Sequence, residues 1–238
     1  MKYLYILKVG TTFPNTKEKL NDFDIWILRF FKNKNIKVKV IDILKGKKLP
    51  KIISSRGFII TGSHCMVTDE LYWSIKLEKY IQNIAKTNIP LLGICYGHQL
   101  IAKALGGKSD FNKKGKEIGV VVIQKNLNNY NDPILKNFPN KFYAYETHYQ
   151  TVVKLPTFSK ILAKNNQDNH QAVRYSKNIW GVQFHPEFDK EIMKEYILNQ
   201  ENDLLKLNFD INKLLLDLRD CEISNRILAN FWKIITQN

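Results

Sequence analysis

The sequence predicts an α/β protein with three layers, in which a mostly parallel central sheet lies between flanking helices and is extended by a small antiparallel flap and a helical C-terminus. Strand-like apolar runs alternate with helical patterns up to residue 94, and this alternation indicates βαβ units with parallel strands. Short β-type runs dominate from residue 118 to 184. After residue 188 the apolar residues again recur with helical spacing.

The first half of the chain supplies the predicted parallel strands and their crossover helices. Strands are expected at 4–9, 37–43, 57–61 and 90–94, and helices at 23–31 and 71–85. The second helix has an apolar stripe with a period near 3.6 residues, and Thr68 or Asp69 precedes it as an N-cap. A further helix should follow residue 95 and end at the glycine pair 106–107.

The second half predicts an extension of the sheet and then helices. Short strands are expected at 118–124, 142–145, 151–154, 161–164, 171–175 and 179–184. After a cap at Ser224, one apolar helix face is formed by Ile227, Leu228, Phe231, Trp232 and Ile235. No linker composition interrupts the chain. We therefore expect a single domain over 1–238, with a core at about 1–188 and a helical extension at about 189–238.

The charge of the chain is strongly positive, which raises nucleic acid or an anionic membrane as a partner. The formal net charge is +15 and the pI is near 9.6. Five of the 37 basic residues are arginines, however, and the lysines are scattered along the chain. A surface that reads phosphate groups more often combines arginine with interleaved aromatic residues. The composition therefore argues against a nucleic-acid partner.

The three cysteines indicate a reducing compartment. Their odd number and wide spacing do not make a disulfide framework, and no Cys-x-x-Cys pair suggests zinc. We expect neither a metal nor a cofactor. The first residues predict a strand instead of a signal peptide, and no stretch approaches the roughly 18 apolar residues of a membrane span. These features predict a cytoplasmic protein with no membrane partner.

Residues 90–102 combine an apolar strand, a tight turn and the start of a helix around Cys95. Gly93 and Gly97 bracket the cysteine in the Gly-x-Cys-x-Gly pattern of a nucleophile elbow. The glycines are expected because strand and helix must pass closely, while the residue at the tip takes a strained backbone conformation. The sulfur would project from the sheet, and the N-terminus of the helix would favour its thiolate.

Two blocks of this sequence resemble the class I (triad) glutamine amidotransferases. The elbow reads GICYGHQ at 93–99, and the second signature reads GVQFHPE at 181–187. Two ordered blocks are far more specific than one. The resemblance runs from Leu4 to about Phe188 and is closest to stand-alone proteins similar to the glutaminase part of GMP synthase. It implies a flavodoxin-like fold and a catalytic triad of Cys95, His185 and Glu187.

The chemistry of these three residue types agrees with that implication. Thiol-dependent amide hydrolysis needs an attacking thiolate, a base that holds and returns a proton, and a group that orients the base. His185 has a suitable pKa range, and Glu187 could fix its tautomer. His185 and Glu187 are separated only by Pro186. An extended backbone held by this proline would direct both side chains to one side. Taken alone, a buried structural cysteine or a core histidine is the more common case.

The resemblance also implies an oxyanion hole and substrate contacts. The N–H of Tyr96 directly follows the nucleophile, and Ser63 would supply the second N–H where the family has a Gly-Gly-Pro-like turn. Substrate contacts are implied for Gly62, Gln99, Thr147, His148 and Tyr149. Tyr149 stands where the family often has glycine. His148 has an alternative as a histidine of the pocket wall, and Cys65 and Cys221 lack the elbow pattern, which indicates passive thiols.

These residues lead to three hypotheses about function. The first is a glutaminase that releases ammonia through a γ-glutamyl thioester on Cys95. Its acceptor would belong to a synthetase partner, because no Gly-x-x-x-x-Gly-Lys loop is present and the chain is too short for an ATP-pyrophosphatase domain. The second is a hydrolase of γ-glutamyl conjugates or peptides with the same triad. The third is a non-catalytic binding or regulatory module on this fold.

Overall fold

The computed structural model describes residues 2–127 and 131–237, so residues 1, 128–130 and 238 of the predicted domain lie outside the described residues. Its elements are β1 (Tyr3–Lys8), α1 (Pro14–Leu20), α2 (Phe23–Leu28), β2 (Val38–Asp42), η1 (Ile52–Ser54), β3 (Ser55–Ile60), η2 (Val67–Asp69), α3 (Tyr72–Ala85), β4 (Leu91–Ile94), α4 (Tyr96–Ala104), β5 (Lys108–Phe111), β6 (Glu117–Lys125), η4 (Pro133–Leu135), β7 (Lys141–His148), β8 (Gln150–Lys154), β9 (Lys160–Lys164), β10 (Ala172–Ser176), β11 (Ile179–Val182), α5 (Lys190–Asn199), α6 (Glu201–Lys206), α7 (Ile211–Leu216) and α8 (Glu222–Gln237).

One sheet of nine strands runs through the molecule in the order β2-β1-β3-β4-β11-β10-β9-β6-β7. The strands from β2 to β11 pair in parallel, and those from β11 to β7 pair antiparallel. Strands β5 and β8 form a second, antiparallel sheet of two strands. The predicted parallel sheet, its antiparallel extension and the small flap are therefore confirmed.

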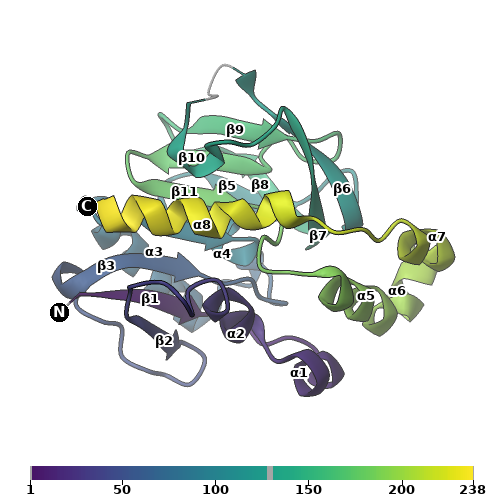
Figure 1. The fold of residues 1–238 in the computed structure, drawn as a ribbon, viewed down its shortest axis with the longest axis horizontal. Coiled ribbons are helices and arrows are strands. Elements are labelled where there is room, and N and C mark those ends of the chain that lie inside the picture. Colours follow the sequence, from purple (N-terminus) through teal and green to yellow (C-terminus); the bar gives the residue numbers. More distant parts are fainter. Residues whose placement is uncertain (1, 128–130, 238) are drawn as a thin grey trace.

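Helices cover both faces of the long sheet, which gives the three predicted layers. Figure 1 shows α8 lying across one face, while α3 and α4 lie on the other. Buried apolar side chains of α8, such as Phe231, pack in one cluster with Ile6 and Leu92 of the sheet. Leu77 of α3 and Leu100 of α4 belong to a second cluster on the opposite face. The C-terminal helix thus buries the apolar face that the sequence predicted.

The site is positioned by the carboxyl ends of three adjacent parallel strands. Strand β4 pairs with β3 on one side and with β11 on the other. The segments that follow these strands carry Ser63, Cys95 and His185. Ligand sites of open α/β sheets lie at this edge, since loops leaving neighbouring strands meet there. The register of β4 with β11 thus brings together two motifs that are distant in the sequence.

Asp22 fixes the start of α2 and places the aromatic side chain of Phe23 beside the site. Its carboxylate accepts hydrogen bonds from the backbone N–H groups of Phe23 and Thr12, both at 2.9 Å. Lys8 on β1 forms an ion pair with it at 2.7 Å. Burial alone would raise the pKa of Asp22, but these donors outweigh burial and lower it to about 2. The carboxylate is therefore ionised at neutral pH.

Two predicted helix caps are wrong. Helix α3 begins at Tyr72 and is preceded by Leu71, while Thr68 and Asp69 lie in the short helix η2. The carboxylate of Asp69 accepts from Met66 N–H, so it stabilises the preceding turn instead of α3. Helix α8 begins at Glu222, and Ser224 lies inside it, where the hydroxyl donates to the carbonyl of Cys221 at 2.7 Å.

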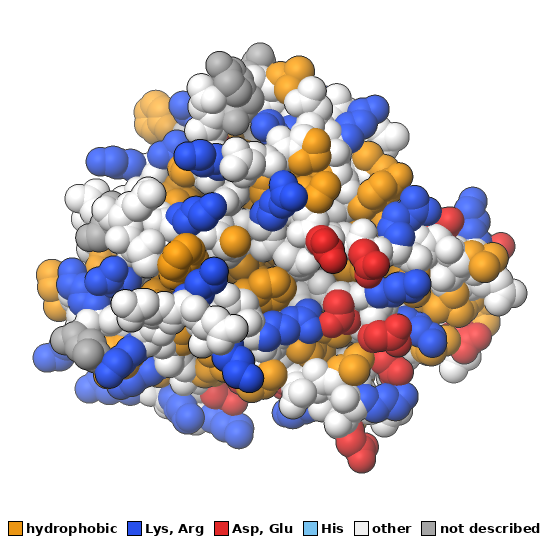
Figure 2. Space-filling model, viewed as in Figure 1, with side chains coloured by type: hydrophobic (Ala, Val, Ile, Leu, Met, Phe, Trp, Pro, Cys, Tyr) orange, Lys and Arg blue, Asp and Glu red, His pale blue; other side chains and the backbone are white. Residues whose placement is uncertain are grey.

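Figure 2 shows basic side chains dispersed across this face of the molecule, and they do not gather into one patch. Acidic side chains are grouped in the part of this face near α5. This pattern agrees with the scattered lysines of the sequence. Within residues 2–127 and 131–237, no helix is long and apolar enough to cross a membrane.

Candidate functional site

Cys95 lies at a strained corner between β4 and α4. Its backbone has φ 48° and ψ −103°, a conformation that residues other than glycine rarely adopt. The two glycines are required for close packing, since neither has a positive φ. A Cβ on Gly93 would lie 2.4 Å from the carbonyl carbon of Gly97, and one on Gly97 would lie 2.6 Å from the carbonyl oxygen of Ile60. The elbow thus has the strain and the close approach that its sequence predicts.

His185 and Glu187 follow β11 and lie together in the interior. The Nδ1 atom of His185 is 2.8 Å from Oε1 of Glu187, and both side chains are almost fully buried. Phe188 stacks on the imidazole with ring centroids 4.2 Å apart. A Cβ on Gly62 would lie 3.0 Å from Cε1 of the imidazole, so a side chain at this position would press against His185. The imidazole is therefore fixed from three sides.

The charges of Cys95 and His185 stabilise one another. Burial opposes ionisation of Cys95, but the charge of His185 and a hydrogen bond to it outweigh burial, so the pKa of the thiol is lowered. Burial likewise disfavours the imidazolium, but Glu187 and Cys95 raise the pKa of His185 well above its usual value. The shifts point to a thiolate and imidazolium pair, the form that a nucleophilic cysteine requires.

Two backbone N–H groups are available beside Cys95. Tyr96 is the first residue of α4, so its N–H has no acceptor within the helix. Ser63 follows β3 without a positive φ, so the serine at this turn requires no backbone strain. Its hydroxyl accepts from the N–H of Cys65 at 3.2 Å, which stabilises the turn. The geometry is compatible with both residues as oxyanion donors, which remains a prediction.

Cys95 and His185 line a single cavity of about 240 Å³. Six of the other residues predicted for the site also line it, namely Ser63, Tyr96, Gln99, Thr147, His148 and Tyr149. Gly62 and Glu187 do not line the cavity; both lie against His185. The fold thus collects the predicted residues from separate segments around one space.

The side-chain amide of Gln99 already makes hydrogen bonds within the protein. Its Nε2 atom donates to the carbonyl of Gln150 at 2.6 Å and to Oε1 of Gln183 at 2.9 Å. An amide nitrogen has two hydrogens, so both are used. The oxygen of Gln99 is then the atom left for a ligand. It can accept a hydrogen bond from the amino group of a ligand, whereas no N–H of this amide is left for a carboxylate.

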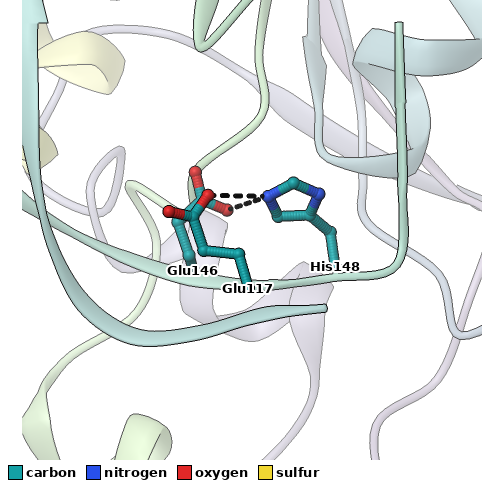
Figure 3. Close-up of side chains that lie close together, drawn as sticks. All are labelled: Glu117, Glu146 and His148. Atoms are coloured by element: carbon teal, nitrogen blue, oxygen red, sulfur yellow. Dashed lines mark hydrogen bonds and ion pairs between the residues drawn. The ribbon is translucent and has the colours of Figure 1, made fainter. Parts of the chain in front are cut away.

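His148 belongs to a buried cluster with Glu117 and Glu146, and Figure 3 shows both carboxyl groups directed at its Nε2 atom. The distances from Nε2 are 3.1 Å to Glu117 and 3.5 Å to Glu146, and Nδ1 lies 2.9 Å from the carbonyl of Gln150. Burial lowers the pKa of His148, but the carboxyl groups outweigh burial and raise it to about 10. Burial raises the pKa of Glu146 well above its usual value.

His148 could also be taken for the base, but both of its ring nitrogens are occupied. Its Nε2 atom faces Glu117 and Glu146, and its Nδ1 atom lies 2.9 Å from the carbonyl of Gln150, so neither nitrogen is left to take a proton from a reacting group. The fold instead supports the structural alternative, in which His148 orders the wall of the cavity through Gln150. Its positive charge also lowers the pKa of Cys95, after the larger contribution of His185.

The same three side chains are the only group in the described ranges that offers three metal-ligand atoms close together, all within 4.8 Å. The shifts in the pKa of Glu146 and in the pKa of His148 both favour the protonated form. A divalent ion would have to displace both protons. The prediction that the site has no metal or cofactor stays a prediction.

Several residues of the cavity wall have no motif in the sequence, and the sequence prediction missed them. Among them are Lys116, which precedes β6, and Tyr196, Gln200 and Asp203, which come from α5, α6 and the junction between these helices. Tyr196 accepts a hydrogen bond from Thr12 and lies 3.2 Å from Nε2 of His64. These side chains reach the cavity only through the packing of the C-terminal helices.

Labelling of the three cysteines tests the elbow directly. We expect a glutamine-like electrophile to alkylate Cys95 first, because only its thiol combines a lowered pKa with a place in the cavity beside His185. Cys65 also lines the cavity but lacks the elbow and its histidine, and burial raises the pKa of Cys221 to about 12. Mass spectrometry of the folded protein measures the order. Equal or faster labelling of Cys65 would contradict the assignment.

The family model for glutamine amidotransferases of class I matches residues 21–204 of this chain. A subunit of the glutamine-hydrolyzing GMP synthase of Pyrococcus abyssi is 37% identical over 113 residues, which are 46% of this chain and 57% of that protein. Gamma-glutamyl peptidase 4 of Arabidopsis thaliana is 32% identical over 143 residues, 59% of this chain and 57% of that protein. The chain thus spans little more than half the length of these curated relatives.

A solved structure matches the fold of this chain over its whole length. A glutamine amidotransferase of Thermotoga maritima matches with a TM-score of 0.81 at 23% identity, and the match covers 100% of both chains. At this identity the likeness concerns the fold. The three-layer architecture, including its C-terminal helices, is therefore found in a second protein.

Proposed function

Because the chain belongs to the glutamine amidotransferase class-I family, we propose that it is a glutaminase-type hydrolase that cleaves a γ-amide through a thioester on Cys95. The single observation that supports this most is the strained elbow, which holds a thiol of lowered pKa in the same cavity as His185, the buried partner of Glu187. Neither the elbow strain nor the buried ion pair has an evident role in packing alone.

In the first step, the thiolate of Cys95 attacks the γ-carbonyl carbon, and the carbonyl electrons move to the oxygen. The N–H groups of Tyr96 and Ser63 donate to this oxyanion. His185 passes its Nε2 proton to the leaving nitrogen, the C–N bond breaks, and ammonia departs. The products are a γ-glutamyl thioester on Cys95 and a neutral imidazole, whose Nδ1–H is held by Glu187.

In the second step, water replaces the leaving group. The neutral imidazole of His185 takes a proton from water, whose oxygen attacks the thioester carbon. Collapse of the second oxyanion breaks the C–S bond, releases the acid and restores the thiolate beside the imidazolium. Glu187 holds Nδ1 of His185, and within the described residues its Nε2 atom has no partner besides Cys95, so Nε2 is available for both proton transfers.

The size of the cavity favours glutamine over larger γ-glutamyl conjugates. Its volume of about 240 Å³ lies below the roughly 300–1,000 Å³ typical of pockets for drug-sized ligands. A small amino acid fits such a space better than a peptide. The relative named gamma-glutamyl peptidase keeps the second candidate, hydrolysis of γ-glutamyl peptides by the same residues, as an alternative.

A panel of γ-glutamyl compounds tests the proposal. Ammonia or amine release would be measured with glutamine, γ-glutamyl dipeptides and γ-glutamyl anilides, for the wild-type chain and for Cys95→Ala. Release from glutamine that is lost in Cys95→Ala supports the glutaminase, and preference for peptides supports the second candidate. No turnover of any compound, with binding retained, would support a non-catalytic module instead.

We also propose that a synthetase protein receives the ammonia, by analogy with the relatives named as GMP synthase subunits. The acceptor site would then lie on that partner. The free state of Cys65, Cys95 and Cys221 supports a reducing, cytoplasmic location. A single domain over 1–238 is supported by the packing of α8 into the same cluster as β1 and β4.

The proposal of a partner predicts slow glutamine hydrolysis by the isolated chain, well below a typical turnover of about 10 per second. Free ammonia has no use without an acceptor, and the turn at Ser63 is the element that a partner would complete. A misplaced donor there costs roughly 10²–10³ in rate. Steady-state kinetics of the purified chain measure this. Robust activity without any addition would show that no gating partner is needed.

A further inference from the structure

Lys116 is a buried cation in the wall of the cavity that contains Cys95. Its residue exposure is only 8%, and within residues 2–127 and 131–237 no ion pair includes its ammonium group. The Nζ atom donates to Oε1 of Gln200 at 2.8 Å and lies 3.9 Å from the centre of the Tyr149 ring. Buried lysines are normally paired with a carboxylate, so this one lacks its usual partner.

The surroundings of the ammonium hold it in one place but do not neutralise it. Gln200 is itself fixed, since its Nε2 atom donates to the carbonyl of Tyr196 at 2.9 Å and reaches the hydroxyl of Thr147 at 3.4 Å. The Tyr149 ring occupies a second side of the cation. An ammonium has three donors, so at least one is left for a ligand. Burial lowers the pKa of Lys116 to about 8, and Asp203 and Cys95 counteract this only in part.

We propose that Lys116 forms a carboxylate subsite of the cavity and thereby selects substrates that carry a carboxylate besides the scissile amide. The inference rests on the proposed function, because the cavity must take a γ-glutamyl compound. The missing counter-ion is the observation that carries it: a bound carboxylate would pair the buried cation in a site already shaped by Gln200 and Tyr149.

Two carboxylates could fill this subsite. One is the α-carboxylate of the γ-glutamyl group, which every such substrate carries. The other is a carboxylate on the leaving group, as in a γ-glutamyl dipeptide. Both would use the same ammonium as a charge-assisted donor. The limited volume of the cavity, about 240 Å³, favours the α-carboxylate, which even the smallest γ-glutamyl substrate carries.

The test compares Lys116→Met with Lys125→Met as a matched control. Lys125 is also only 8% exposed, but its Nζ atom donates to the carbonyl of Phe138 and does not line the cavity. KM and kcat would be measured with glutamine, with the α-amide of glutamine, which lacks the carboxylate, and with γ-glutamylglycine. Thermal unfolding of both variants would verify that they fold.

For Lys116→Met we expect KM for glutamine to rise about 10- to 100-fold, the loss of one charge-assisted hydrogen bond, while KM for the α-amide changes less than about threefold. Lys125→Met should retain the wild-type preference for glutamine over the α-amide. An effect on γ-glutamylglycine alone would assign the subsite to the leaving group. An unchanged preference for glutamine over its α-amide in Lys116→Met, with γ-glutamylglycine also unaffected, would overturn the proposal.

Equilibrium binding separates this proposal from the proposed function. L-Glutamate would be titrated into Cys95→Ala and into the double variant Cys95→Ala with Lys116→Met. Weaker binding in the double variant, by the same factor as for KM, supports the subsite even if no compound is turned over. Normal glutaminase activity, with glutamate binding and γ-glutamylglycine kinetics both unchanged by the loss of Lys116, would remove the subsite and leave the proposed function intact.

Discussion

Replacing Cys95 by alanine should abolish turnover, with a loss on the order of 10⁶ in kcat, because Cys65, the other thiol that lines the cavity, lacks the elbow and its histidine. His185→Ala should come close to this loss, since it removes the group that carries the proton in both steps. Glu187→Ala should retain at least about tenfold more activity than His185→Ala, because Glu187 orients the imidazole and does not line the cavity. Single-turnover kinetics with the best substrate would measure the chemical step.

The controls for this series are Cys221→Ala and His148→Ala. Cys221 does not line the cavity, and burial raises the pKa of its thiol to about 12, so its loss should leave kcat unchanged. His148→Ala should mainly raise KM, because it loosens the cavity wall through Gln150. If His148→Ala damaged the chemical step more than His185→Ala, the base would have been assigned to the wrong histidine.

The elements with a strong repeating pattern could be predicted from the sequence, and those set by local contacts could not. Helix α3 buries Leu77, Ile81 and Ile84 along one face, so its period is visible in the sequence. Helix α1 buries only Thr16, and the four residues of β5 alternate no apolar side chains, so neither gives a signal. The caps predicted for α3 and α8 are wrong for the same reason, which is that local contacts decide them. Asp69 bonds to the N–H of Met66 and Ser224 to the carbonyl of Cys221, and neither side chain caps the first turn of the helix expected to follow it.

The candidate site likewise has residues that the sequence identifies and residues that only the structure identifies. Cys95, His185 and Glu187 lie in short motifs whose spacing reflects their geometry, so the sequence identifies them before the sheet order is known. The opposite wall of the cavity depends on helices α5 and α6 folding back over β6, which places Gln200 beside Lys116. No spacing rule connects residues 84 positions apart that meet only through tertiary packing. The cavity wall that would select the substrate can therefore be identified only from the three-dimensional structure.

The glycine before the nucleophile should be the most sensitive position of the elbow outside the reacting groups. In Gly93→Ala, the new Cβ would lie 2.4 Å from the carbonyl carbon and 2.5 Å from the oxygen of Gly97, and 2.6 Å from the N–H nitrogen of His98. These are backbone atoms of the first turn of α4, so no side-chain rotation can relieve the contact. We expect the free energy of unfolding to fall by about 3 kcal/mol, near the upper range for overpacking.

The displaced turn should also reduce activity, since Cys95 and the N–H of Tyr96 lie between the two glycines. A shift of about 1 Å in a catalytic group costs roughly 10²-fold in rate. Gly46→Ala is the matched control: its Cβ would meet nothing within 4 Å, and its φ of 66° adds a strain of about 1 kcal/mol away from the cavity. Urea unfolding and kinetics of both variants decide the question, and a Gly93→Ala protein as stable and active as Gly46→Ala would show that strand and helix can separate without cost.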